Sequence, residues 1–162
     1  MKRCAAALAA MLALFSARAD AAKTAEQPRL EVTTLDGGHF DLAAQRGHWV
    51  VVNLWATWCT PCIAEMPDIS AFVGAHPGVA AIGLAWEDTD KAEVLAFAKK
   101  HPVDYPLAQV DVYDPPADFE PPRGLPTTYL IAPDGRVAKK FTGPITRVDL
   151  DKALAAGAPA AP

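Results

Sequence analysis

The chain has 162 residues, of which 51% are hydrophobic and 21% charged, and its formal net charge is −4. This length and composition are typical of one globular domain with its own core, and they exclude a disordered chain or a mini-protein that needs disulfides or metals to fold. Because no excess of basic residues is present, no nucleic-acid partner is expected.

The start of the chain predicts a secretory signal peptide, residues 1–19. Lys2 and Arg3 precede a short apolar run, and small residues around Ala19 suggest cleavage after that position. The run is shorter than the roughly 20 residues of a spanning helix, and an uncleaved membrane anchor is the alternative. Cleavage would remove Cys4 and three basic residues, which changes the net charge from −4 to −7. A periplasmic protein is therefore expected, in a compartment where disulfides persist.

The first half of the chain predicts two short strands, a buried strand and a helix. A flexible lead over 20–28 precedes a domain over 29–156. The stretch LEVTTLDGGHF, 30–40, predicts two strands around a turn, and 41–47 a short helical turn. The apolar, β-branched run 48–56 is typical of a strand buried on both faces. The helix over about 60–75 is expected to be interrupted at Pro67, which lacks a backbone donor.

The second half predicts three strands and two helices. A buried strand over 78–86 is followed by a helix over 90–101, capped by Asp88 or Thr89, and by a short strand over 105–110. The proline-rich segment 111–122 predicts an irregular surface loop. The segments 125–132 and 137–143 predict a β-hairpin, and 146–156 a last helix that begins at a threonine cap. The tail 157–162 is expected to be disordered. This order implies a mixed sheet with helices on both faces and an N-terminal β extension.

Two cysteines, Cys59 and Cys62, stand where the buried strand 48–56 turns into a helix. As a structural staple the pair would close a very short loop, which the chain-entropy model values at only about 2 kcal/mol. A zinc site needs four ligands, and the four histidines are scattered singly along the chain. The remaining use is redox exchange. The free N–H groups of a helix N-terminus stabilise a thiolate on Cys59, and Cys62 lies one turn inside the helix.

The motif and its neighbours resemble the TlpA/ResA-like thiol-disulfide oxidoreductases of bacterial envelopes, which have the thioredoxin-like fold. The matching segments are VVVNLWATWCTPCIAEMP, GLPTTYLIAPDGRV and FTGPIT. They extend the resemblance over roughly residues 30–154. The combination of C-x-P-C after a buried strand with G-L-P-T-T-Y-L-I further along is much more specific than a lone C-x-x-C.

The resemblance implies a role for each matching residue. Cys59 is the exposed nucleophile and Cys62 the buried resolving cysteine. Pro126 is a cis-proline that faces the disulfide. Trp58, Leu125 and Thr127 are the expected substrate contacts, and the backbone at Leu125 pairs with an extended client segment like an added strand. No bound cofactor is needed, because the cysteine pair itself carries the electrons.

Two further positions, Asn53 and Glu65, bear on the transfer of the thiol protons. Cytoplasmic thioredoxins have a buried aspartate beneath the cysteines, and Asn53 stands there in this chain. The TlpA/ResA-like proteins instead have a glutamate three residues after the second cysteine, which Glu65 matches. On a helix this spacing places Glu65 near Cys62, where its carboxylate can accept the thiol proton and raise thiol pKa values. The alternative is a solvated helix residue.

The predicted function is the reduction of disulfides in exported proteins, such as the cysteine pairs of apocytochrome c or of copper-site proteins. The resemblance implies a membrane thiol donor of the DsbD/CcdA type. A Cu(I) metallochaperone that uses both thiolates and a DsbA-type disulfide oxidase remain as alternatives. The loop 111–122 departs from the family, in which a short helix is expected, and the choice of client therefore stays open.

Overall fold

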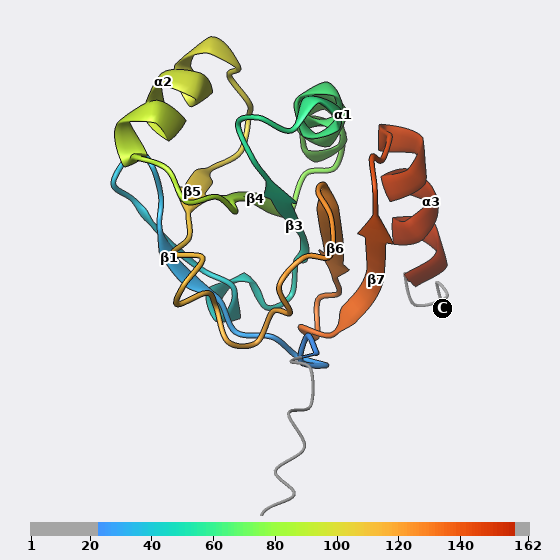
Figure 1. Cartoon of the computed structure of the whole chain (residues 1–162). Coiled ribbons are helices and arrows are strands. Elements are labelled where there is room, and N and C mark those ends of the chain that lie inside the picture. The colour runs from blue at the N-terminus through green and yellow to red at the C-terminus, as the bar shows by residue number, and fades with distance from the viewer. Residues whose placement is uncertain (1–22, 158–162) are drawn as a thin grey trace, which may run out of the picture.

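The structure is a computed structural model and describes residues 23–157. The predicted signal peptide and all but the first residue of the predicted tail lie outside this range. The elements are, in chain order (Figure 1), β1 (Glu31–Thr33), β2 (His39–Asp41), the 3-10 helix η1 (Ala43–Gln45), β3 (Trp49–Trp55), α1 (Thr60–Ala75), β4 (Val79–Ala85), α2 (Lys91–Lys100), β5 (Leu107–Gln109), β6 (Thr127–Ile131), β7 (Val137–Thr142) and α3 (Arg147–Gly157). Every strand and helix expected from the sequence is present.

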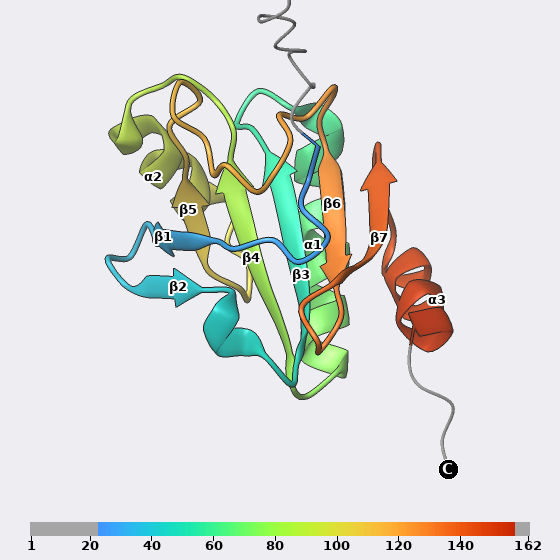
Figure 2. The ribbon, with the colours of Figure 1, turned by 90° about the horizontal axis from the view of Figure 1, so that it is seen from below.

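The central sheet has five strands in the order β5-β4-β3-β6-β7, and β1 and β2 form a separate hairpin beside it (Figure 2). Strands β3, β4 and β5 run parallel, whereas β6 and β7 run antiparallel to their neighbours. The carboxyl ends of β3, β4 and β5 therefore meet the start of β6 at one edge of the sheet. Binding sites in open α/β sheets form at such an edge.

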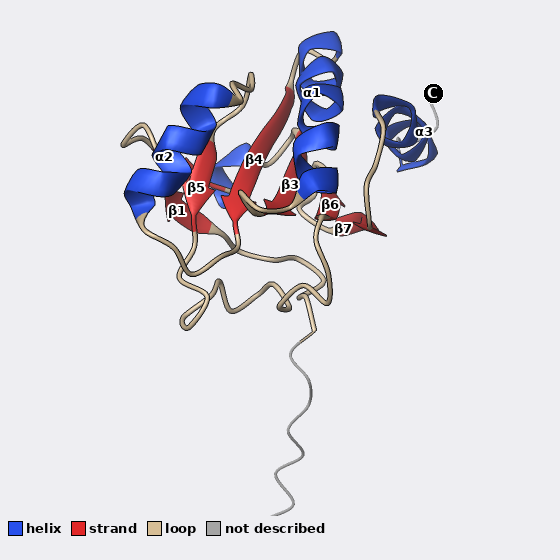
Figure 3. Cartoon of the chain, turned by 45° about the horizontal axis from the view of Figure 1, so that its top comes forward, coloured by secondary structure: helices blue, strands red, loops and turns tan. Residues whose placement is uncertain are grey.

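All three α-helices lie on one face of the sheet (Figure 3), so the expectation of helices on both faces is wrong. Successive residues of a strand point to opposite faces: Val51 and Trp55 pack with the helices, whereas Val52 and Leu54 face away. The reason is topological. The two crossovers β3-α1-β4 and β4-α2-β5 step in the same direction across the sheet, and right-handed connections then place both helices on the same side. The thioredoxin-like α/β fold itself is confirmed.

The opposite face is covered by β1, β2, η1 and the proline-rich loop, whose Phe119 is buried. As predicted, the loop 111–122 is irregular. The lead, which was expected to be flexible, forms hydrogen bonds with the rest of the domain over residues 23–28. The Ala25 N–H donates to the Asp118 carbonyl (2.8 Å), and the Val137 N–H donates to the Glu26 carbonyl (3.0 Å). The lead and the loop therefore hold each other against the sheet.

The three α-helices begin and end close to the residues predicted from the sequence, and only the start of α2 is shifted. The expected interruption at Pro67 is wrong, because helix α1 continues through Pro67 to Ala75 as one element. Helix α2 begins at Lys91 with Asp90 at its N-cap, two residues later than a cap at Asp88 would place it. Helix α3 begins at the expected threonine: Thr146 Oγ1 accepts the Asp149 N–H (3.3 Å), and the Asp149 carboxylate accepts the Thr146 N–H (2.9 Å). Within residues 23–157, the helices are too short or too polar to span a bilayer.

A matched pair of glycine substitutions tests the packing of the helical face. A Cβ at Gly83 would lie 2.5 Å from Leu107 Cδ2 and 3.0 Å from Trp55 Nε1, so Gly83→Ala should lower the free energy of unfolding by about 1–3 kcal/mol. Gly74 in α1 has no atom within 4 Å of the added Cβ, and Gly74→Ala should stabilise by up to about 1 kcal/mol. Urea unfolding of both variants measures the difference, and equal effects would contradict this packing.

Candidate active site

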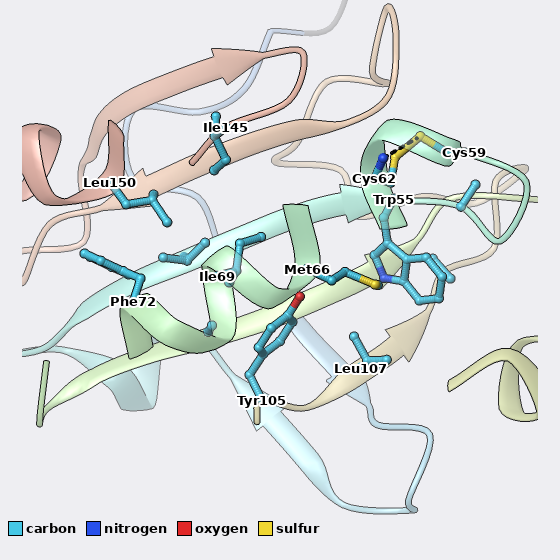
Figure 4. Close-up of a cluster of buried hydrophobic side chains, with 14 of the residues drawn as sticks. Trp55, Cys59, Cys62, Met66, Ile69, Phe72, Tyr105, Leu107, Ile145 and Leu150 are labelled. Carbon is cyan, nitrogen blue, oxygen red and sulfur yellow. Dashed lines mark hydrogen bonds between the residues drawn. A yellow bond between two sulfur atoms is a disulfide. The ribbon is translucent and has the colours of Figure 1, made fainter. Parts of the chain in front are cut away.

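A disulfide joins Cys59 and Cys62 at the N-terminus of α1, directly after β3 ends (Figure 4). Cys59 is the N-cap residue of the helix, and its Sγ accepts the Cys62 N–H at 3.3 Å. Pro61 occupies the first turn, where a backbone N–H is not needed for the helix. A thiolate at Cys59 Sγ would therefore be stabilised by the hydrogen bond from the Cys62 N–H and by the positive end of the helix dipole.

The two sulfurs differ little in exposure in this disulfide form. Cys59 is 4% exposed and Cys62 is completely buried, so the contrast between an exposed and a buried cysteine is smaller than expected, though in the expected order. Both cysteines belong to the apolar cluster that contains Trp55 and Met66 (Figure 4). Trp55 is thus a core residue, as predicted, whereas Trp58 is 69% exposed beside Cys59.

The loop before β6 lies at the same edge as the disulfide, because Thr127 pairs with Leu54 near the end of β3. The Leu125–Pro126 peptide bond is cis, as predicted. Thr127 is 1% exposed, and its hydroxyl donates to the Gly124 carbonyl (2.8 Å). Its side chain therefore shapes the loop and does not reach the surface as a substrate contact. Leu125 is half-buried, and no backbone hydrogen bond of Leu125 is formed with the described residues.

Glu65 is buried in α1 with an exposure of 2%, which excludes a solvated helix residue. Asn53 Nδ2 donates to Oε1 of Glu65 (2.7 Å), and the Ile145 N–H donates to Oε2 (2.9 Å). Burial raises the pKa of Glu65 to about 7, against the opposing effect of these two hydrogen bonds. The carboxyl group therefore changes its charge near neutral pH.

The surroundings of Glu65 contain groups that the sequence did not point to. Asn53 also donates to Thr128 Oγ1 (2.9 Å), which fixes the amide between β3 and β6. The Tyr105 side chain is buried, and burial followed by the charge of Glu65 raises the pKa of its hydroxyl. Thr128 stands in the G-L-P-T-T-Y-L-I motif, which gave it no role of its own, and Tyr105 stands in no motif. Only the fold brings these two residues into the surroundings of Asn53 and Glu65, so the sequence pattern gave no signal for their place there.

A second buried carboxylate, Glu87, holds the segment before Cys59. It is 8% exposed, and its two oxygens accept the Thr57 N–H (2.8 Å) and the Thr57 hydroxyl (2.9 Å). Glu87 directly follows the predicted strand 78–86. Its position at the carboxyl end of a parallel strand was a usable signal that the sequence analysis missed.

The described residues contain no group of three or more His, Cys, Asp or Glu side chains that could hold a metal ion. The geometry supplies a cysteine pair at a helix N-terminus, a buried carboxyl group in the same helix and the loop before β6 at the same edge of the sheet. These parts suit nucleophilic attack of a thiolate on a disulfide, followed by intramolecular resolution.

Comparisons with known proteins agree with this chemistry. The AhpC/TSA family matches residues 23–140. The thiol-disulfide oxidoreductase ResA of Bacillus thuringiensis subsp. konkukian is 34% identical over 134 residues, which cover 80% of this chain and 75% of that protein. ResA of Bacillus subtilis is 28% identical over 138 residues, covering 83% and 75%.

Solved structures show the same fold. A putative thiol:disulfide interchange protein DsbE from Chlorobium tepidum superposes with a TM-score of 0.72 at 21% identity, covering 83% of this chain and 96% of that one. A DsbF homologue from Corynebacterium diphtheriae gives 0.68 at 26% identity, covering 80% and 84%. The chain therefore belongs to the AhpC/TSA family and, within it, to the ResA-like thiol-disulfide oxidoreductases of thioredoxin-like fold.

Proposed function

We propose that this thiol-disulfide oxidoreductase acts as a reductant of disulfides in exported proteins. The observation that carries the proposal is the placement of the disulfide at a helix N-terminus with a buried, neutral-range carboxyl group one turn further along α1. The helix end favours a thiolate on Cys59, and Glu65 supplies a proton acceptor for Cys62.

In the proposed reaction, the Cys59 thiolate attacks one sulfur of the client disulfide, and the other client sulfur leaves as a thiolate. Cys62 then loses its proton to the Glu65 carboxylate and attacks Cys59 Sγ. This step forms the Cys59–Cys62 disulfide and releases the second client sulfur, which takes up a proton. Two electrons thus pass from the dithiol to the client. The backbone at Leu125, beside Pro126, and the exposed Trp58 are proposed to hold the client segment against Cys59.

Whether the protein reduces or oxidises client disulfides depends on the charges around its two cysteines. Thr60 and Pro61 between them carry no charge, and the Glu65 carboxylate close by disfavours thiolates. Helix dipole stabilisation alone should lower the pKa of the Cys59 thiol only moderately. We therefore expect a reduction potential below about −220 mV, on the side of thioredoxin.

Redox titration against glutathione or dithiothreitol buffers measures this potential directly. A value near −120 mV, as in strong disulfide oxidases, would show that the protein oxidises its clients and would end the reductase proposal.

The proposed place of action is the periplasm, with the protein either released by signal cleavage or held by an uncleaved N-terminal segment. Support comes from the basic and apolar start of the sequence. The proposed clients are the cysteine pairs of apocytochrome c or of copper-site proteins, and a membrane thiol donor of the DsbD/CcdA type would return the electrons. Capture of mixed disulfides from the cell envelope identifies these partners.

A further inference from the structure

A groove of about 890 Å³ lies between β1 and the loops that follow β4 and β5. Because β3, β4 and β5 are parallel, these loops stand at the same edge of the sheet as the disulfide. Glu87 joins the two places: it lines the groove, and it accepts the N–H of Thr57, two residues before Cys59. A polypeptide bound at Cys59 can therefore extend into the groove.

The lining of the groove is strongly acidic. It contains six carboxylates, Glu31, Glu87, Asp88, Asp111, Asp114 and Asp118, against two basic residues, Arg29 and Lys91. Arg29 is already paired with Asp118 (3.1 Å). Within residues 23–157, no ion pair involves the exposed carboxylates of Asp88, Asp111 or Asp114. Four negative charges thus remain in excess.

The walls of the groove are fixed by hydrogen bonds. On one side, the Arg29 guanidinium and backbone N–H both donate to the Asp118 carboxylate. On the other side, the Tyr113 hydroxyl donates to Asp88 (2.7 Å), and the Tyr113 N–H donates to Asp111 (2.8 Å). The Tyr113 side chain is 81% exposed. The groove therefore combines a preformed shape with an aromatic side chain that a bound molecule can cover.

The carboxylates are spread along the groove and do not converge on a point. In the described part of the chain, no cluster of three potential ligands is close enough to hold a metal ion. Negative charges arranged in this way complement a ligand that carries several positive charges spaced along its length. Lysine and arginine side chains meet this condition, since they pair with separate carboxylates and stack on a tyrosine ring.

We propose that this acidic groove binds a lysine- or arginine-rich segment of the client polypeptide, next to the client disulfide that Cys59 attacks. The inference rests on the proposed reductase function. It adds that the preferred clients carry basic residues next to the disulfide. Much of one wall comes from residues 111–118, in the loop that departs from the family pattern. Selection of clients by charge is therefore a property of this chain's own loop.

Two synthetic peptides test the inference. They share one intramolecular disulfide loop and differ only in the flanking residues, which are lysines in one and glutamates in the other. The reduced full chain should reduce the lysine peptide with a kcat/KM roughly tenfold higher at low ionic strength, and added salt should remove most of this preference. Asp114→Lys should reduce the preference at least about fivefold. Glu31→Lys, on the opposite wall, should act in the same direction.

Asp104→Lys is the matched control. Asp104 is exposed and precedes β5, at the opposite edge of the sheet, so the same charge reversal there should leave the preference unchanged. An uncharged disulfide, hydroxyethyl disulfide, separates docking from chemistry. If no form of the protein reduces it, the proposed function fails. If wild type and Asp114→Lys reduce it equally but wild type shows no preference between the peptides, only the groove inference is overturned. A salt-sensitive dimer that Asp114→Lys abolishes would assign the groove to a second copy and would also overturn it.

Discussion

Replacing Cys62 with serine should turn the protein into a trap for its clients, whereas replacing Cys59 with serine should not. The Cys62→Ser variant keeps the sulfur at the helix N-cap and can still attack a disulfide, but no second thiol remains to release the product. In Cys59→Ser the thiol at the helix N-cap is missing, and the remaining thiol of Cys62 lies within α1 and is fully buried. We therefore expect no attack on a client disulfide. Both variants should lose reductase activity to the background rate.

Non-reducing gels of envelope extracts that contain each tagged variant measure the trapped complexes. The two variants control for each other, because each loses the same short-loop disulfide, worth about 2 kcal/mol. Similar amounts of trapped protein in both would contradict the roles assigned to the two cysteines, while a lack of trapping by either would argue against client reduction through a mixed disulfide.

Replacing Glu65 with glutamine should slow client reduction by at least about tenfold at neutral pH while leaving the fold intact. The amide cannot accept the proton of Cys62, so the resolving step loses its base. The pH profile is the decisive measurement. The wild-type rate should rise as pH increases through about 7, where Glu65 loses its proton, and this rise should be missing in the variant. Glu93→Gln, on the exposed surface of α2, provides the control. Coinciding profiles for wild type and Glu65→Gln would show that Glu65 has no part in proton transfer.

The same substitution should change how stability depends on pH. The pKa of Glu65 is raised on folding from 4.5 to about 7, so between these values the folded state holds a proton that the unfolded state has released. The free energy of unfolding must then fall as pH increases across this window, by about 3 kcal/mol for this group in full. Below pH 4.5 both states are protonated and the group contributes no slope.

Urea unfolding of the oxidised proteins at pH 5 and pH 8 tests this sign. Wild type should lose more stability than Glu65→Gln between the two values, so that the variant is relatively favoured at the higher pH. The opposite order would mean that the two hydrogen bonds from Asn53 and Ile145 outweigh burial and that the carboxyl group is already ionised well below neutrality.

The sequence predicted the parts of this protein whose physical cause is local. The buried strand, the helix N-terminus with its two cysteines and the cap at Thr146 each depend on neighbouring residues, and each was found. Glu65 was singled out by its spacing of three residues from Cys62 along a helix, and it is buried in α1. The cis bond before Pro126 was expected from the family resemblance alone, since nothing in the residues around it indicates one.

What the sequence did not predict depends on long-range packing. Glu65 receives its second hydrogen bond from Ile145, 80 residues further along the chain, and Asn53 reaches Thr128 across a strand pair. The side of the sheet on which α2 lies depends on the direction of two crossovers, which the order of elements does not show. The lead over 23–28 lacks any regular pattern, and its hydrogen bonds to Asp118 and Val137 exist only once the sheet has formed.

The two faces of the sheet carry separate apolar clusters, so the segments that cover one face can be exchanged without changing the other. Chemistry at the disulfide depends on residues packed with the helices, whereas the proline-rich loop and the lead cover the other side. Neighbouring residues of β3 divide between the two, since Val51 supports the helices and Val52 supports the covering segments. A protein engineer can therefore treat the loop and the lead as one graft, to be transplanted together because each holds the other, while the redox half of the molecule is left unaltered.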